Sequence, residues 1–171
     1  MKAERRLCRD QLTHERLLEV LDYNQETGIF IWKVAKISRA KVGDVAGYMR
    51  NGYIFIMIDG NEYRAHRLSW FYVNGEWPSS QIDHINGIRD DNRLVNLRTV
   101  NHSENGQNQR KAKSSNTTGF LGVSFHKARK NFTAQIELNG KKKHLGCFDS
   151  AELAHQCYIE AKRGLHPFCT I

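Results

Sequence analysis

The chain has 171 residues, of which 40% are hydrophobic, and its net charge is +8. This length allows one domain or two small ones, and the modest apolar content excludes a single large core. No apolar run approaches the roughly 18 residues of a membrane span, so we expect a soluble, cytoplasmic protein with no membrane partner.

The positive charge is concentrated in the last third of the chain. From Arg110 to Ile171 there are eleven Lys and Arg residues against four Asp and Glu residues, a net of +7 that leaves +1 for everything before it. A basic segment of this kind can serve solubility alone. So uneven a distribution nevertheless favours a polyanionic partner, and we expect nucleic acid.

The cysteines argue against disulfides and structural zinc, because no two of them have C-x-x-C spacing. They are Cys8, Cys147, Cys157 and Cys169. We expect Cys147 and Cys157 to be buried, since they lie in a predicted strand and a predicted helix.

The first 75 residues predict small elements with clear turn signals. In chain order these are a helix over 12–21, a strand over 29–34, strands over 53–58 and 62–66, and a helix over 67–73. Thr13 is placed as the N-cap of the first helix. Gly60 supplies the positive φ that the hairpin turn requires, and Gly75 ends the second helix.

The chain is organised around residues 81–110. Two short apolar pieces bracket a loop rich in Asp, Asn and Arg, and a polar segment that suits a helix follows. This order predicts strand, loop, strand, helix. Small oxygen or imidazole side chains stand at three separated points, which are Asp83 with His84, then Asn96, then Asn105.

This arrangement resembles the HNH nucleases, in a variant with His84, Asn96 and Asn105 at the three motif positions. The resemblance implies a ββα-metal (His-Me finger) core in which His84 is the general base and Asn96 orients its ring. It also implies that Asp83 and Asn105 hold the metal ion. Neighbouring side chains on a strand point to opposite faces, so Asp83 and His84 can serve one centre only if the strand ends there.

The residue types suit phosphodiester hydrolysis. A histidine with a pKa near 6.5 can take a proton from water at neutral pH. A carboxylate and an amide oxygen suit a hard divalent cation. We therefore expect one weakly held Mg²⁺ (or Mn²⁺) ion per active site.

Other polar residues around this segment are assigned less directly. His66 is expected to be structural, at the end of a strand, while Arg67 is a candidate phosphate contact. Arg98 either clamps a phosphate or braces the loop. Asn108 either reaches the substrate or lies on a solvated helix face. Residues 90–93 are expected to form the loop rather than to bind metal.

A second module is predicted after a linker-like stretch. Strands are expected over 120–126, 132–138 and 141–148, followed by a helix over 151–163 that Asp149 or Ser150 caps and Gly164 closes. Alternation gives the sheet an apolar face, which the helix covers, with Leu121, Val123, Phe125, Ala134, Ile136, Leu138 and Leu145. The opposite face is polar and carries Ser124, His126, Thr133, Gln135, Lys142 and His144.

This module resembles an AP2 domain in residues 119–123, 132–136 and 145–149. Domains of that type lay their sheet in the major groove of DNA. Phe132 stands where the family more often has Trp, so an indole N–H is missing there. The residues expected to contact DNA are Arg67, Arg98, Asn108, Ser124, His126, Lys127, Arg129, Lys130, Thr133, Gln135, Lys142 and His144.

Taken together, these features predict an α+β chain with a ββα-metal nuclease core and a small three-stranded antiparallel sheet with one packed helix. The expected domains are 1–65 (a helix and hairpin region packed on the nuclease core), 66–112 (the HNH nuclease), 113–118 (linker) and 119–171 (AP2-like, DNA-binding). We expect a metal-dependent DNA endonuclease of the phage or intron homing type. It would act on double-stranded DNA in the host cytoplasm, with no obligate protein partner. The alternative is a DNA-binding regulator with a catalytically dead HNH core.

Overall fold

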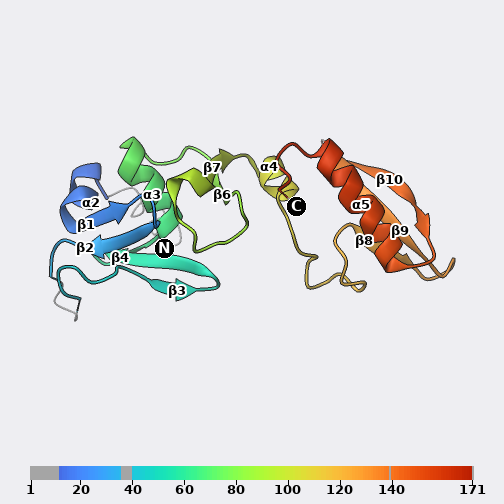
Figure 1. Cartoon of the computed structure of the whole chain (residues 1–171), viewed down its shortest axis with the longest axis horizontal. Coiled ribbons are helices and arrows are strands. Elements are labelled where there is room, and N and C mark those ends of the chain that lie inside the picture. Colours follow the sequence, from blue (N-terminus) through green and yellow to red (C-terminus); the bar gives the residue numbers. More distant parts are fainter. Residues whose placement is uncertain (1–11, 36–39, 139, 171) are drawn as a thin grey trace, which may run out of the picture. The chain divides into compact units, whose positions relative to one another are not determined.

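The computed structural model describes residues 12–35, 40–138 and 140–170, and they form two compact units. The first unit ends at Thr99 and the second begins at Val100 (Figure 1). In the part of the chain that the structure describes, no helix is long and apolar enough to cross a membrane. Among the described residues, Cys147, Cys157 and Cys169 form no disulfide, and Cys8 lies outside the described residues.

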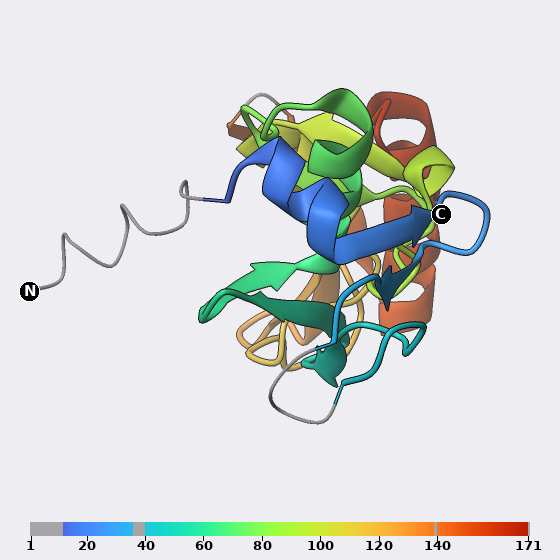
Figure 2. The same ribbon diagram turned by 90° about the vertical axis from the view of Figure 1, so that its left-hand side faces the viewer.

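The first unit contains three small antiparallel sheets, ordered β1-β2, β3-β4-β5 and β6-β7. Its elements are α2 (His14–Val20), β1 (Leu21–Asn24), β2 (Ile29–Trp32), β3 (Tyr48–Arg50), β4 (Tyr53–Ile58), β5 (Asn61–Arg64), α3 (Ala65–Asn74), β6 (Gln81–His84), the 3-10 helix η2 (Leu94–Asn96) and β7 (Leu97–Val100). Figure 2 shows α2, in blue, beside α3, in green. The predicted mixture of helices and small antiparallel sheets is confirmed.

Residues from both helices and several strands share one core in this unit. Leu17, Ile56 and Leu68 are fully buried in it, and Phe30 is 2% exposed. Burying a large apolar side chain contributes roughly 1.5–3 kcal/mol to folding. This core therefore fixes the first two sheets against α2 and α3, and its member Tyr23 donates a hydrogen bond to the Asn92 carbonyl in the loop between β6 and β7.

Local signals predicted the turns and caps of this unit correctly. The Thr13 hydroxyl accepts the Arg16 N–H at 3.1 Å, as an N-cap does. Asp59 and Gly60 have φ of 47° and 80° in the hairpin turn. The N–H of Gly75, which has left-handed geometry, closes α3 on the carbonyl of Phe71.

Two predicted elements of this unit were wrong in detail. Leu21 ends the first helix in extended conformation and begins β1, which pairs with β2, so a strand replaces the expected last helical turn. His66 was predicted at a strand end, but α3 begins at Ala65 and includes it. Pairing between strands and burial against the core decide these boundaries, and neither is visible in a local pattern.

The second unit contains α4 (His102–Gln107), β8 (Val123–His126), β9 (Asn131–Leu138), β10 (Lys141–Phe148) and α5 (Ala151–Leu165). Its antiparallel sheet has the order β10-β9-β8, and α5 packs on it (Figure 1). The three predicted strands and the helix are confirmed. The Ser150 hydroxyl caps α5 by accepting the Leu153 N–H at 3.2 Å.

Three expectations for the second unit were wrong. Gly164 does not close α5, which continues to Leu165 with His166 as its C-cap. The strand predicted over 120–126 starts later, because β8 begins at Val123. Phe125 does lie on the apolar face, with its ring centroid 5.0 Å from that of Phe132, although it is 43% exposed on the edge strand β8. Cys147 is exposed rather than buried.

The stretch predicted as a linker is organised by Asn116. Its amide nitrogen donates to the carbonyls of Phe120 and Val123, both at 3.0 Å, and its oxygen accepts the N–H groups of Thr118 and Gly119. Asn116 therefore ties this stretch to the start of β8.

Gly28 should be the most sensitive glycine of the first unit. Its φ is +73°, and an added Cβ would lie 2.5 Å from the Arg93 nitrogen and 2.7 Å from the Asn92 carbonyl carbon. Gly28→Ala should lower the free energy of unfolding by about 3 kcal/mol, because backbone strain and a clash combine. Gly60→Ala, with φ of +80° and open space around it, is the matched control and should cost about 1 kcal/mol. Urea unfolding measures both, and equal losses would contradict the close approach.

Candidate active site

The strand β6 ends at His84, which was the condition for Asp83 and His84 to serve one centre. The N–H of Gly87, at φ of 72°, donates to the His84 carbonyl at 2.9 Å and turns the chain away. Asp83 is 9% exposed and His84 is 5% exposed. Two adjacent ionisable side chains are thus buried at the end of one short strand.

Asp83 forms an ion pair with Arg98 of β7. The Arg98 Nη2 and Nε donate to Oδ2 of Asp83 at 2.8 and 3.0 Å. The side chains are only 22% and 10% exposed, so the pair is shielded from water and stronger than a surface pair. Arg98 thus links β7 to β6, and its contact with a phosphate stays a prediction. A cation at Asp83 would have to share this carboxylate with a guanidinium or displace it.

His84 is enclosed by other rings and by the loop. Its imidazole lies 5.0 Å from that of His66, edge to face, and 6.0 Å from the Tyr53 ring, centroid to centroid. Burial lowers the pKa of His84 below 6.5, although contact with Asn92 and the nearby Asp83 carboxylate act to raise it. At neutral pH the imidazole is therefore neutral, which is the state a general base requires.

His66 is a second buried imidazole beside the first. It is 4% exposed in the first turn of α3. Burial, followed by the charges of His84, Arg64 and Arg67, lowers its pKa to about 3. His66 is thus neutral at any physiological pH and packs against His84 as an uncharged ring.

Asn96 holds the loop instead of the His84 ring. Its Oδ1 accepts the Asn86 N–H at 2.9 Å, and its Nδ2 donates to the Asp91 carbonyl at 2.8 Å. It ends η2, immediately before β7, rather than lying on the second strand. The expected bond from Asn96 to His84 is not made, because both ends of the Asn96 amide are used to close the loop.

Asn92 is the residue of this site that sequence reasoning missed. It is 2% exposed, its carbonyl accepts the Tyr23 hydroxyl at 2.6 Å, and its side chain contacts His84. It had been grouped with the loop residues 90–93. Nothing in the run Asp-Asp-Asn-Arg distinguishes the buried member, because its burial depends on Tyr23, far away in the sequence.

The other predicted metal ligand, Asn105, lies on α4 in the second unit. The helix begins with a capping box, in which Asn101 accepts the Glu104 N–H at 3.0 Å and Glu104 accepts the Asn101 N–H at 2.7 Å. Asp83 belongs to the first unit, so the convergence of Asp83 and Asn105 stays a prediction. No three His, Cys, Asp or Glu side chains within the described ranges gather where they could share a metal ion.

Asn108 is buried, so it does not lie on a solvated helix face, and its contact with the substrate stays a prediction. It is the C-cap of α4, is 7% exposed, and its Oδ1 accepts the Thr170 hydroxyl at 2.6 Å. The Gln107 side chain also accepts the Phe168 N–H at 3.4 Å. These contacts tie α4 to the residues that follow α5.

Most of the predicted DNA contacts of the second module are exposed. Ser124, His126, Lys127, Arg129, Lys130, Gln135, Lys142 and His144 are all exposed. Thr133 is not, at 8% exposed, since it packs near Cys147. Arg67 in the first unit is half-buried, with its guanidinium carbon 5.8 Å from the Trp77 ring centroid.

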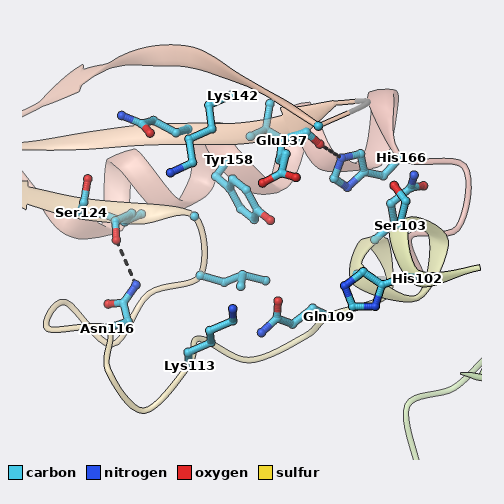
Figure 3. A pocket seen from close by; sticks show the side chains of 18 residues that line it. His102, Ser103, Gln109, Lys113, Asn116, Ser124, Glu137, Lys142, Tyr158 and His166 are labelled. Carbon is cyan, nitrogen blue, oxygen red and sulfur yellow. Dashed lines mark hydrogen bonds between the residues drawn. The ribbon is translucent and has the colours of Figure 1, made fainter.

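A hollow of about 470 Å³ is lined by residues of this sheet, of α4 and of α5 (Figure 3). Ser124, Gln135 and Lys142 line it together with His102 and Ser103 of α4. In Figure 3, Lys142 and Tyr158 face Lys113 and Gln109 across the hollow. Three of the predicted DNA contacts therefore share one hollow with the apolar side chains of Leu121, Val123 and Ile136.

Comparison with known proteins identifies the segment that carries this site. Residues 63–107 match the model of the HNH endonuclease family. Protein 3.8 of Escherichia phage T7 is 34% identical over 104 residues, which cover 60% of this chain and 84% of that protein. No solved structure matches the chain.

The two buried histidines should make the fold sensitive to acid. Their folded pKa values lie below 6.5, so the unfolded chain binds more protons. Their contribution to stability is complete above about pH 6.5 and is lost as pH falls toward 3, by at most about 1.4 kcal/mol per pH unit for each histidine. Urea unfolding at pH 7.5, 6 and 5 measures this. His66→Phe should reduce the change in the free energy of unfolding with pH. If that change stays as large as in the unaltered chain, His66 is not the source of the acid sensitivity.

Proposed function

The chain belongs to the family of Protein 3.8 of Escherichia phage T7 and carries an HNH endonuclease domain at residues 63–107, and from that premise we propose that it is a metal-dependent DNA endonuclease. Its reaction is the hydrolysis of phosphodiester bonds in double-stranded DNA. The proposal includes a biological role as a homing endonuclease of the phage or intron type, and the relative in phage T7 agrees with the phage part of that role.

One observation carries the proposal. Inside the matched segment, a neutral, buried imidazole and a buried carboxylate occupy consecutive positions at the end of β6. Burying two such groups opposes folding, since each loses its hydration. Burial lowers the pKa of His84, and histidines whose pKa is shifted in this way concentrate at functional sites.

In the proposed reaction His84 takes a proton from the attacking water. His66 and Tyr53 pack against its ring, and Asn92 contacts it from the loop. Asn96 affects the His84 ring only indirectly, because its hydrogen bonds to Asn86 and Asp91 hold that loop closed. The ring is thus oriented by packing and by the loop.

Asp83 and Asn105 are proposed to hold the divalent cation, Mg²⁺ or Mn²⁺. Their carboxylate and amide oxygens are the donors that such hard cations prefer. When bound, the cation supplies neutralisation of the charge that develops on the phosphate and the leaving oxygen. Arg98 already occupies Oδ2 of Asp83, so metal binding and the ion pair compete for one carboxylate.

DNA is proposed to lie on the polar face of the second module, in the manner of an AP2 domain. Exposed basic side chains at Lys127, Arg129, Lys130 and Lys142 support this. Their contacts would be mainly to phosphates, so they would give affinity and a strong dependence on salt.

His84→Ala should abolish cutting while leaving DNA binding intact. Loss of a general base costs about 10²–10⁴-fold in rate. Nicking of supercoiled plasmid with Mg²⁺ measures cutting, a chelator should stop it, and anisotropy with a labelled duplex measures binding. Because burial lowers the pKa of His84, the decline of cutting in acid should come at a lower pH than the titration of an ordinary histidine near 6.5.

The regulator with a dead nuclease core is the competing outcome of this experiment. The Arg98–Asp83 ion pair favours it, because the carboxylate already has a positive partner. Binding that survives without cutting under any divalent cation would establish it.

Replacing Arg129 and Lys130 by Ala should weaken DNA binding and lower its salt dependence. Each lost phosphate contact should reduce the slope of log K against log salt by about 0.9. Arg163→Gln, an exposed site on α5, is the matched control of equal charge per site and should leave the slope unchanged. If the unaltered chain, the double variant and Arg163→Gln give the same slope of log K against log salt, this surface does not contact DNA.

A further inference from the structure

The sheet β3-β4-β5 has a second face that the proposed function does not use. Ile54, Ile56 and Ile58 of β4 point into the core of the first unit. Alternation therefore turns Tyr53 and Phe55 outward, beside Arg50 of β3 and Arg64 of β5. The pairs Arg50–Tyr53 and Phe55–Arg64 are in register across these strands.

Arginines cover the rings on this face. The guanidinium carbon of Arg50 lies 4.1 Å from the Phe55 centroid, and that of Arg64 lies 5.2 Å from the Tyr53 centroid. Arg89, from the loop after β6, lies 5.0 Å from the same Tyr53 centroid and donates to the Asn51 carbonyl at 3.4 Å. We call these five residues, Arg50, Tyr53, Phe55, Arg64 and Arg89, the arginine face.

The charge of the arginine face is only partly compensated. Arg50 is paired with Glu62, which also accepts the Tyr48 hydroxyl. Over the residues that the structure describes, neither Arg64 nor Arg89 forms an ion pair. Two exposed, positive guanidinium groups are thus held over one ring, an arrangement that a row of phosphates would stabilise.

The arginine face also reaches the proposed base. The Tyr53 centroid lies 6.0 Å from that of His84 and 5.5 Å from that of His66. A backbone phosphate bound by Arg64 or Arg89 would therefore lie next to the ring that contacts His84. Contact with the Tyr53 ring restricts both guanidinium groups before binding, so less conformational freedom is lost when phosphate binds.

We propose that the arginine face binds the sugar–phosphate backbone of duplex DNA and leads it to His84. This inference rests on the proposed nuclease function and extends it to residues that the sequence did not assign. Phosphate contacts of this kind fix the register of the duplex and carry no sequence information. Arg64 and Arg89 are the contacts, and Tyr53 positions them.

Salt-dependent binding to the full chain tests the proposal. Arg64→Gln, Arg89→Gln and the double variant are titrated into labelled duplexes of two unrelated sequences, in chelator, between 50 and 300 mM KCl. The double variant should bind both duplexes more weakly, with the slope of log K against log salt reduced by about 1.8. Arg64→Lys should keep the slope and weaken binding, because charge remains while the planar stack is lost.

Arg16→Gln is the matched control, since it removes the same charge from α2, where Arg16 contacts Asp59 and Glu19 instead of a ring. The control should bind as the unaltered chain does, and a double variant with unchanged slope overturns the proposal. Parallel nicking assays separate the two hypotheses. If the unaltered chain cuts DNA and the double variant binds normally, only the proposal of the arginine face is refuted. If the double variant binds more weakly but the unaltered chain never cuts, only the nuclease proposal is refuted.

Discussion

Burial of the His84 imidazole is the constraint on which the first unit depends. The ring is covered by His66, by Tyr53 and by a loop that Asn92 and Asn96 hold closed. In bulk water a histidine is partly protonated near neutral pH, and a protonated ring cannot accept a proton. Burial removes that limitation, and it makes the stability of the fold depend on the same ring staying neutral.

Asp83, the residue before His84, carries a charge that an ion pair with Arg98 balances, whereas the His84 imidazole is neutral. Asp83 has a positive partner on the adjacent strand, so its negative charge is balanced in the absence of any ion. A buried carboxylate left without such a partner would be costly. The pair thus explains how a candidate metal ligand can be buried in a stable fold, and why an incoming cation would meet competition.

Local rules predicted much of this fold, and distant contacts account for what they missed. The Thr13 cap, the Gly60 turn and the end of β6 at His84 each depend on a few neighbouring residues. The partners of Asn96 and the burial of Asn92 depend on how the loop closes on residues far away in the sequence. The stacking of Arg64 and Arg89 on Tyr53 likewise joins a sheet to a loop that the pattern shows only as separate segments.

The contact at Gly28 bears on whether the nuclease segment could be moved to another protein. That glycine lies against the backbone of Asn92 and Arg93, and Tyr23 holds the Asn92 carbonyl. Both lie outside residues 63–107, the stretch that matches the HNH endonuclease family. Transplanting that stretch alone would leave its loop without the hairpin of β1 and β2 behind it. The smallest transferable cassette therefore begins before Tyr23.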